Sequence, residues 1–93
     1  MYSGVMPTGS KDQPDAFSEA LFTVVRAKMG MMQLNIADIS RLTDIPRSTL
    51  SRLINGKRQP DMPQMMKIAT ALNMPLAQLV AKAEELQAGH EPF

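Results

Sequence analysis

Between residues 15 and 87, the apolar side chains recur with the period of an α-helix, and no stretch alternates as a β-strand would. Proline, glycine and capping residues divide this region into short helices with short connections. The predicted helices cover residues 15–29, 35–43, 46–55 and 75–87, with a further helix between Asp61 and Asn73. The sequence therefore predicts an all-α fold, a compact five-helix bundle.

Residues at the ends of these helices support the predicted boundaries. Asn35 and Asp61 are good N-terminal caps, and Gln64, three residues after Asp61, completes a variant of the capping box. Gly30 and Asn73 are expected to take the left-handed conformation that ends a helix. Local signals thus place both ends of most of the predicted helices.

The chain has 93 residues, which is enough for one domain with one modest core. Residues 1–14 contain glycine, serine and proline without periodicity, so we expect a flexible N-terminal arm before the domain of residues 15–87. Residues 88–93 are expected to be a frayed tail. The sequence has no cysteine, no apolar run of membrane-spanning length and no signal-peptide pattern, and a cytoplasmic protein is expected.

The net charge of +1 hides an asymmetry along the chain. Residues 26–67 carry a formal charge of +5, whereas the remaining residues sum to −4. The basic residues of this central segment are Arg26, Lys28, Arg41, Arg47, Arg52, Lys57, Arg58 and Lys67. A basic centre between acidic flanks favours an anionic partner such as a nucleic acid, although a solvated surface with unevenly placed charges gives the same count.

The segment RSTLSRLINGKRQP, residues 47–60, concentrates this charge on one helix and the loop after it. A helical wheel places Leu50 and Leu53 on one side. The opposite side collects Arg47, Ser48, Ser51, Arg52 and Asn55. Arginine can donate two hydrogen bonds to guanine, and serine is short enough to let a helix approach the bases. Lys57 and Arg58 follow at once and can neutralise backbone phosphates.

The stretch IADISRLTDIPRSTLSRLINGKRQPDMPQMMKIATALNMPLAQL, residues 36–79, resembles the helix-turn-helix domains of the lambda-repressor-like, or Cro/C1-type (XRE), family. In that family the second helix braces the DNA backbone and the third lies in the major groove. The base-contacting positions of the family are matched by Arg47, Ser48 and Arg52, with Ser51 beside them. The backbone-contacting loop is matched by Asn55, Lys57 and Arg58. The resemblance implies a DNA-binding protein.

Two departures from the family pattern fall in the turn between the second and third predicted helices. Asp44 stands where glycine is common in the family, and aspartate still tolerates a left-handed turn. Pro46 stands where a hydroxyl side chain often caps the third helix, and proline has no side chain that can do so. The turn is still expected to form.

Two further departures affect the predicted contacts with the DNA backbone. Ile36 stands where the family often has a glutamine that contacts phosphate, and Gln33 or Asn35 is the available substitute. Ile54 stands where a glutamate often pairs with an arginine of the first helix, so Arg26 is expected to be free to face phosphate. The added candidates for backbone contact are Arg26, Lys28 and Gln33.

These observations predict a sequence-specific double-stranded DNA-binding regulator of transcription, more often a repressor. A phage or host regulator and the antitoxin of a toxin–antitoxin pair all fit. One helix-turn-helix module makes a small interface, so a homodimer on a pseudo-palindromic operator is expected. The candidates for the dimer surface are Val80, Ala83, Leu86 and Phe93.

Other function classes are less consistent with the sequence. A protein-interaction module that docks a toxin or polymerase subunit through the acidic last helix is the main alternative, and steep salt dependence would discriminate against it. An RNA-binding protein is disfavoured, because no aromatic residue stands on the basic side to stack bases. His90 stands alone and no catalytic arrangement is evident, so no metal, cofactor, membrane association or enzymatic activity is expected.

Overall fold

The computed structural model describes residues 15–93, and the predicted N-terminal arm, residues 1–14, lies outside the described residues. The described chain forms α1 (Ala16–Met32), α2 (Ile36–Thr43), α3 (Arg47–Ile54), α4 (Met62–Ala71) and α5 (Leu76–Gln87). No strand occurs among residues 15–93. The predicted all-α bundle of five helices is therefore confirmed.

The predicted N-terminal caps are present. Each cap side chain accepts a hydrogen bond from a backbone N–H group that the first helical turn leaves without a partner. The Asn35 side chain accepts a hydrogen bond from the backbone N–H of Asp38 at 2.8 Å, and the Asp38 carboxylate accepts one from the Asn35 N–H at 2.9 Å. Asp61 and Gln64 form the same reciprocal pair at the start of α4. Asn73, after α4, takes the predicted left-handed conformation, with φ of 60°.

The end of α1 differs from the prediction. Gly30 does not end the helix, which continues to Met32, and Gln33 takes the left-handed conformation with φ of 59°. The Gln33 N–H donates to the carbonyl of Gly30, and the Leu34 N–H donates to that of Met29 at 2.9 Å. Leu34 is half-buried against the core, and this contact fixes where the chain leaves the helix. Burial of Leu34 outweighs the local preference of Gly30.

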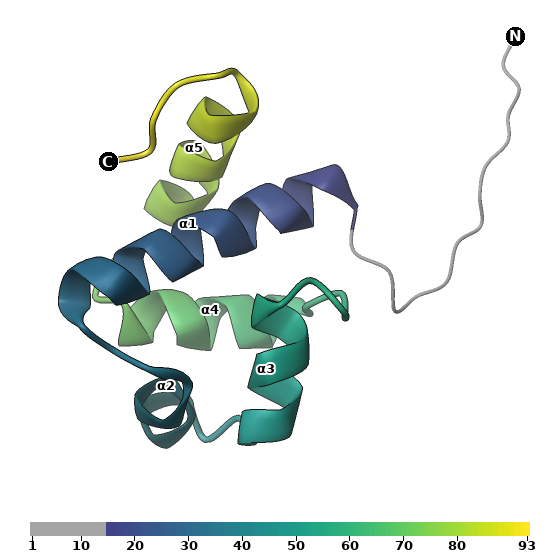
Figure 1. The fold of residues 1–93 in the computed structure, drawn as a ribbon, viewed down its shortest axis with the longest axis vertical. Coiled ribbons are helices and arrows are strands. Elements are labelled where there is room, and N and C mark those ends of the chain that lie inside the picture. Colours follow the sequence, from purple (N-terminus) through teal and green to yellow (C-terminus); the bar gives the residue numbers. More distant parts are fainter. Residues whose placement is uncertain (1–14) are drawn as a thin grey trace, which may run out of the picture.

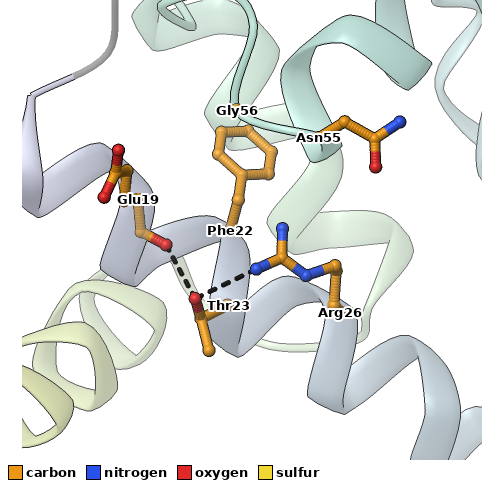
Figure 2. A pocket seen from close by; sticks show the side chains of 6 residues that line it. All are labelled: Glu19, Phe22, Thr23, Arg26, Asn55 and Gly56. Carbon is orange, nitrogen blue, oxygen red and sulfur yellow. Dashed lines mark hydrogen bonds between the residues drawn. The ribbon is translucent and has the colours of Figure 1, made fainter.

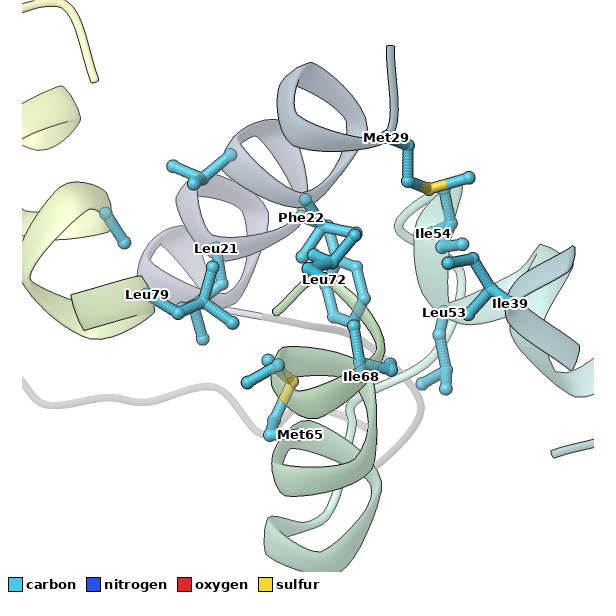
Figure 3. Close-up of a cluster of buried hydrophobic side chains, with 14 of the residues drawn as sticks. Leu21, Phe22, Met29, Ile39, Leu53, Ile54, Met65, Ile68, Leu72 and Leu79 are labelled. Atoms are coloured by element: carbon cyan, nitrogen blue, oxygen red, sulfur yellow. The ribbon is translucent and has the colours of Figure 1, made fainter. Parts of the chain in front are cut away.

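In Figure 1, α1 crosses the bundle with α5 above it and α2, α3 and α4 below it. α1 packs against α5 and α3, α4 packs against α5, and α2 packs against α3 and α4. Figure 3 shows Leu21 of α1 near Leu79 of α5, and Phe22 of α1 near Ile68 of α4 and near Leu72, the residue directly after α4. Each fully buried side chain of this size contributes roughly 1.5–3 kcal/mol relative to its exposed state. The core thus fixes α1, α4 and α5 as the frame on which α2 and α3 are carried.

The last helix and the residues after it bear on two predictions: the candidate dimer surface and the frayed tail. Ala83 is fully buried, so it cannot form part of a dimer surface, and Val80 and Leu86 are half-buried against the core. The expected frayed tail instead folds back onto α5. The Lys82 ammonium donates to the carbonyl of Pro92 at 2.7 Å and lies 4.6 Å from the ring centroid of Phe93.

Candidate nucleic-acid interface

The turn between α2 and α3 is fixed by polar side chains on its inner side. Asp44 takes the expected left-handed conformation with φ of 63°, and its N–H donates to the carbonyl of Ser40 at 2.8 Å. The Ser40 hydroxyl donates to the carbonyl of Ile45 at 2.6 Å. The Thr43 hydroxyl donates to the Ile39 carbonyl and accepts a hydrogen bond from the Ile45 N–H at 3.2 Å. These bonds, together with the burial of Ile45, set the angle between the two helices.

α3 presents two chemically different sides. Leu50, Leu53 and Ile54 are buried and attach it to the bundle. Its opposite side is exposed at Arg47, Ser48, Arg52 and Asn55, and half-buried at Ser51. The helical wheel therefore predicted correctly which side faces solvent.

The exposed polar groups of α3 are largely uncommitted within the protein. The Asn55 amide donates to the Ser51 hydroxyl at 3.3 Å. Neither Arg47 nor Arg52 has a carboxylate within ion-pairing distance in the part of the chain that the structure describes. Arg41 on α2 contrasts with them, because it pairs with Asp38 at 2.9 Å. Arg47 and Arg52 thus keep their hydrogen-bond donors for a partner.

The Asp38 carboxylate at the start of α2 is held in its ionised form. The backbone N–H of Asn35 is the main cause that lowers the pKa of Asp38 below its usual value of 3.8, and the Arg41 side chain adds to the shift. A carboxylate at this end of a helix also complements the positive end of the helix dipole. The charge of Asp38 therefore stabilises the helix that precedes the turn.

The loop after α3 carries two exposed cations. Gly56 takes a left-handed conformation with φ of 73°, and the Lys57 N–H donates back to the carbonyl of Arg52 at 2.7 Å. This arrangement ends α3 and turns the chain outward, which leaves Lys57 and Arg58 exposed. The sequence predicted a helix that ends at residue 55, in agreement with this end.

The far end of the same loop is attached to α1 through Gln59, a residue for which no sequence motif indicated a role. Its amide donates to the Ser18 hydroxyl at 3.0 Å, and its side-chain oxygen accepts from the backbone N–H of Asp15 at 3.3 Å. Ser18 is only 4% exposed, so this hydrogen bond is largely shielded from water. This hydrogen bond joins residues 41 positions apart in the chain, so no local sequence pattern predicts it.

Arg26 is placed differently from the expectation that it would be free. Its guanidinium donates to the backbone carbonyl of Ile54, the last residue of α3, and to the Thr23 hydroxyl at 3.1 Å. Figure 2 shows Arg26 and Thr23 of α1 facing Asn55 and Gly56 at the end of α3. The expectation that Arg26 is free was wrong: Ile54 offers it no carboxylate, and Arg26 instead bonds the backbone carbonyl of the same residue.

The other two added candidates lie apart from α3. The Lys28 ammonium lies 5.8 Å from the ring centroid of Phe93, so the structure places Lys28 beside the C-terminal tail. Gln33 is exposed in the connection between α1 and α2. The structure thus gathers the predicted DNA-contacting residues on α3 and its following loop, but does not add Lys28 to that group.

Two short helices joined by a tight turn, the second with an exposed basic and hydroxyl-bearing side, define a helix-turn-helix DNA-binding protein. The family model for helix-turn-helix domains matches residues 25–79, more than half of the chain. The chain belongs to this family, the Cro/C1-type (XRE) helix-turn-helix proteins, which are DNA-binding regulators of transcription. No curated protein and no solved structure gave a significant match.

Two further findings concern membrane spans and metal sites within residues 15–93. No helix within residues 15–93 is long and apolar enough to cross a membrane. Within the same residues, no three side chains of histidine, cysteine, aspartate or glutamate gather closely enough to hold a metal ion.

Proposed function

We propose that this protein is a sequence-specific double-stranded DNA-binding repressor of transcription that binds its operator as a homodimer in the cytoplasm. The observation that carries the proposal is the exposed side of α3, where two arginines stand without a carboxylate partner among residues 15–93. A buried hydrophobic side beneath them holds this surface in place. Membership of a DNA-binding family supports the same function.

In the proposed complex, α3 lies in the major groove of B-DNA. Arg47 and Ser48, at its N-terminal end, contact base edges, because N-terminal residues of a recognition helix reach deepest into the groove. Arg52, five residues further along α3, contacts a second base step, with Ser51 beside it. Arginine that bonds guanine O6 and N7 contributes about 1–3 kcal/mol of discrimination against the wrong base.

The loop after α3 supplies the proposed contacts with the DNA backbone. Asn55, Lys57 and Arg58 are exposed and follow the recognition helix directly. Gln33, exposed before α2, is proposed to contact a phosphate on the other side of the turn. These contacts fix the orientation of the domain and strengthen binding to every sequence, since phosphates carry no sequence information.

A homodimer is proposed because one module buries only about 600–1,000 Å² of protein surface on DNA. Two copies on half-sites one helical turn apart would supply the missing specificity. Of the candidate residues for the dimer surface, Phe93 is 43% exposed, and Val80 and Leu86 are half-buried. A repressor of this kind acts by covering a promoter, and the phage, host and antitoxin contexts all remain consistent with it.

The alternative function is a protein-interaction module that docks a toxin or polymerase subunit through α5. Glu84 and Glu85 favour it, because both are exposed near the end of that helix. A protein interface with these few charges would weaken much less with added salt than DNA binding, which falls steeply because many phosphates are contacted. The salt dependence of complex formation therefore separates the two functions.

Selection of bound sequences from a random duplex pool tests the proposal. We expect recovery of a two-fold repeat whose half-sites are centred about 10 base pairs apart. Binding to the recovered duplex is then measured by fluorescence anisotropy between about 50 and 200 mM salt, where each phosphate contact contributes a slope of about −0.9. Failure to enrich any sequence, together with no binding at the lowest salt, would refute the proposed function.

A further inference from the structure

The proposed recognition helix, α3, is not stable by itself. It has eight residues, far fewer than an isolated helix needs to be stable in water. Pro46 precedes it and provides no side-chain cap, so its N-terminal end lacks the stabilisation that Asn35 and Asp61 give to α2 and α4. Its geometry must therefore come from contacts with the rest of the bundle.

At the C-terminal end of α3, one of these contacts is a hydrogen bond from α1. The last carbonyls of a helix have no partner within it, and the carbonyl of Ile54 accepts a hydrogen bond from the Arg26 guanidinium. A cation at this end also complements the negative end of the helix dipole. The guanidinium is itself held by the Thr23 hydroxyl, which donates to the carbonyl of Glu19 at 2.9 Å (Figure 2).

We infer that Arg26 is a positioning residue for the recognition helix and not a contact with phosphate. By holding the carbonyl of Ile54, it fixes the last turn of α3 and with it the direction of Arg52, which lies two residues earlier on the exposed side. Arg26 thus determines how accurately Arg52 meets its base pair. This inference rests on the proposed function, because it assigns Arg52 to a base.

The effect of Arg26 is confined to one end of the interface. Arg47 lies at the other end of α3, next to the turn held by Ser40 and Ile45. The loop with Lys57 and Arg58 has a second attachment at its far end, where Gln59 bonds Ser18 of α1. Loss of Arg26 therefore disturbs recognition at the base step contacted by Arg52, and leaves both the Arg47 step and the phosphate contacts in place.

The test uses the full chain with the substitutions Arg26→Gln, Arg26→Lys and Thr23→Val, and Lys57→Gln as the comparison that removes a proposed phosphate contact. Each variant is titrated against the selected duplex and against a series of single-base changes in it. The step contacted by Arg52 is identified first, as the one where Arg52→Ala abolishes discrimination. Salt slopes and thermal unfolding are recorded for every variant.

For Arg26→Gln we expect discrimination to fall about tenfold at the Arg52 step and to stay unchanged at the Arg47 step, with an unchanged salt slope. Lys57→Gln should do the opposite, lowering the slope by about 0.9 and weakening all duplexes evenly. Arg26→Lys should lose less discrimination than Arg26→Gln, because lysine keeps the positive charge and N–H donors but not the planar fork. Thr23→Val, on the exposed side of α1, should show a smaller loss at the same step.

Other outcomes would overturn the inference. If Arg26→Gln lowers the salt slope and weakens all sequences evenly, with both restored by Arg26→Lys, then Arg26 contacts phosphate. If discrimination is lost equally at every step, or at no step, then Arg26 does not position Arg52. Should Arg26→Gln fail to fold, the same comparison is made with Arg26→Lys and Thr23→Val. A wild-type chain that enriches no sequence refutes the proposed function itself.

Discussion

The amide of Gln59 donates a hydrogen bond to the hydroxyl of Ser18 at 3.0 Å, and this contact joins the loop after the recognition helix to the first turn of α1. The loop carries Lys57 and Arg58, the proposed anchors on the DNA backbone. Because Ser18 is 4% exposed, the bond lies where water competes weakly. The placement of the anchors therefore depends on a residue outside the DNA-binding surface.

Replacing Gln59 by leucine should lower the free energy of unfolding by about 1–3 kcal/mol, because the buried Ser18 hydroxyl loses its partner. The double variant with Ser18→Ala should be less destabilised than the sum of the two single changes, since no unpaired polar group then remains. Urea unfolding measures both. Gln78→Leu, a matched change at an exposed position of α5, should stay within about 0.5 kcal/mol of wild type. If the losses of unfolding free energy from the two single changes simply add in the double variant, the hydrogen bond between Gln59 and Ser18 does not stabilise the protein.

The division of the interface into base contacts and phosphate contacts predicts two kinds of variant. Arg47→Ala or Arg52→Ala should weaken binding to the selected duplex by about 1–3 kcal/mol and relax preference at one base step. Lys57→Ala should weaken binding to selected and random duplexes by the same factor and reduce the salt slope by about 0.9. Fluorescence anisotropy titrations measure these effects. Identical behaviour of the two kinds of variant would show that the division is wrong.

The two glycines near the helix ends should respond to alanine in opposite directions. Gly30 lies inside α1, and a Cβ there meets nothing within 4 Å, so Gly30→Ala should stabilise the protein by about 0.5–1 kcal/mol. Gly56 has φ of 73°, so Gly56→Ala should destabilise it by about 1 kcal/mol or more. Each kcal/mol shifts the melting temperature by roughly 4–8 °C for a domain of this size. A rise in melting temperature for both variants would contradict the placement of Gly56.

The lowered pKa of Asp38 predicts a specific dependence of stability on pH. A carboxyl group whose pKa is lower in the folded than in the unfolded chain stabilises the fold above its unfolded value, here near 3.8. That contribution is lost as the pH falls through the lower, folded value. Asp38→Asn should therefore reduce the loss of stability on acidification, as measured by urea unfolding at neutral pH and below pH 4.

Arg41→Gln serves as the comparison for the Asp38 prediction. It should reduce the acid-dependent loss of stability less than Asp38→Asn does, because the hydrogen bond from the Asn35 N–H, the largest single cause of the lowered pKa, remains in this variant. If Asp38→Asn leaves the acid dependence unchanged, the hydrogen bonds at the start of α2 do not persist in solution.

The sequence alone was sufficient for features that depend on residues a few positions apart. The Asn35 cap that begins α2 and the capping box of Asp61 and Gln64 that begins α4 join residues three positions apart, and the left-handed Asp44 follows from its own backbone preference. The helical spacing of Leu50 and Leu53 predicted which side of α3 is buried. Backbone geometry and the alternation of polar and apolar residues act within one or two turns, so these features do not need the rest of the fold.

Only the tertiary structure decided the features that join distant parts of the chain. Burial of Leu34 moved the end of α1 from Gly30 to Gln33, and packing of α5 placed Ala83 in the core. The bond from Arg26 to the carbonyl of Ile54 spans 28 residues. The sequence does not indicate which side chain will donate a hydrogen bond to a given backbone carbonyl. That choice is made by the packing of α1 against α3, because hydrogen bonds between distant residues form only after the helices have been brought together.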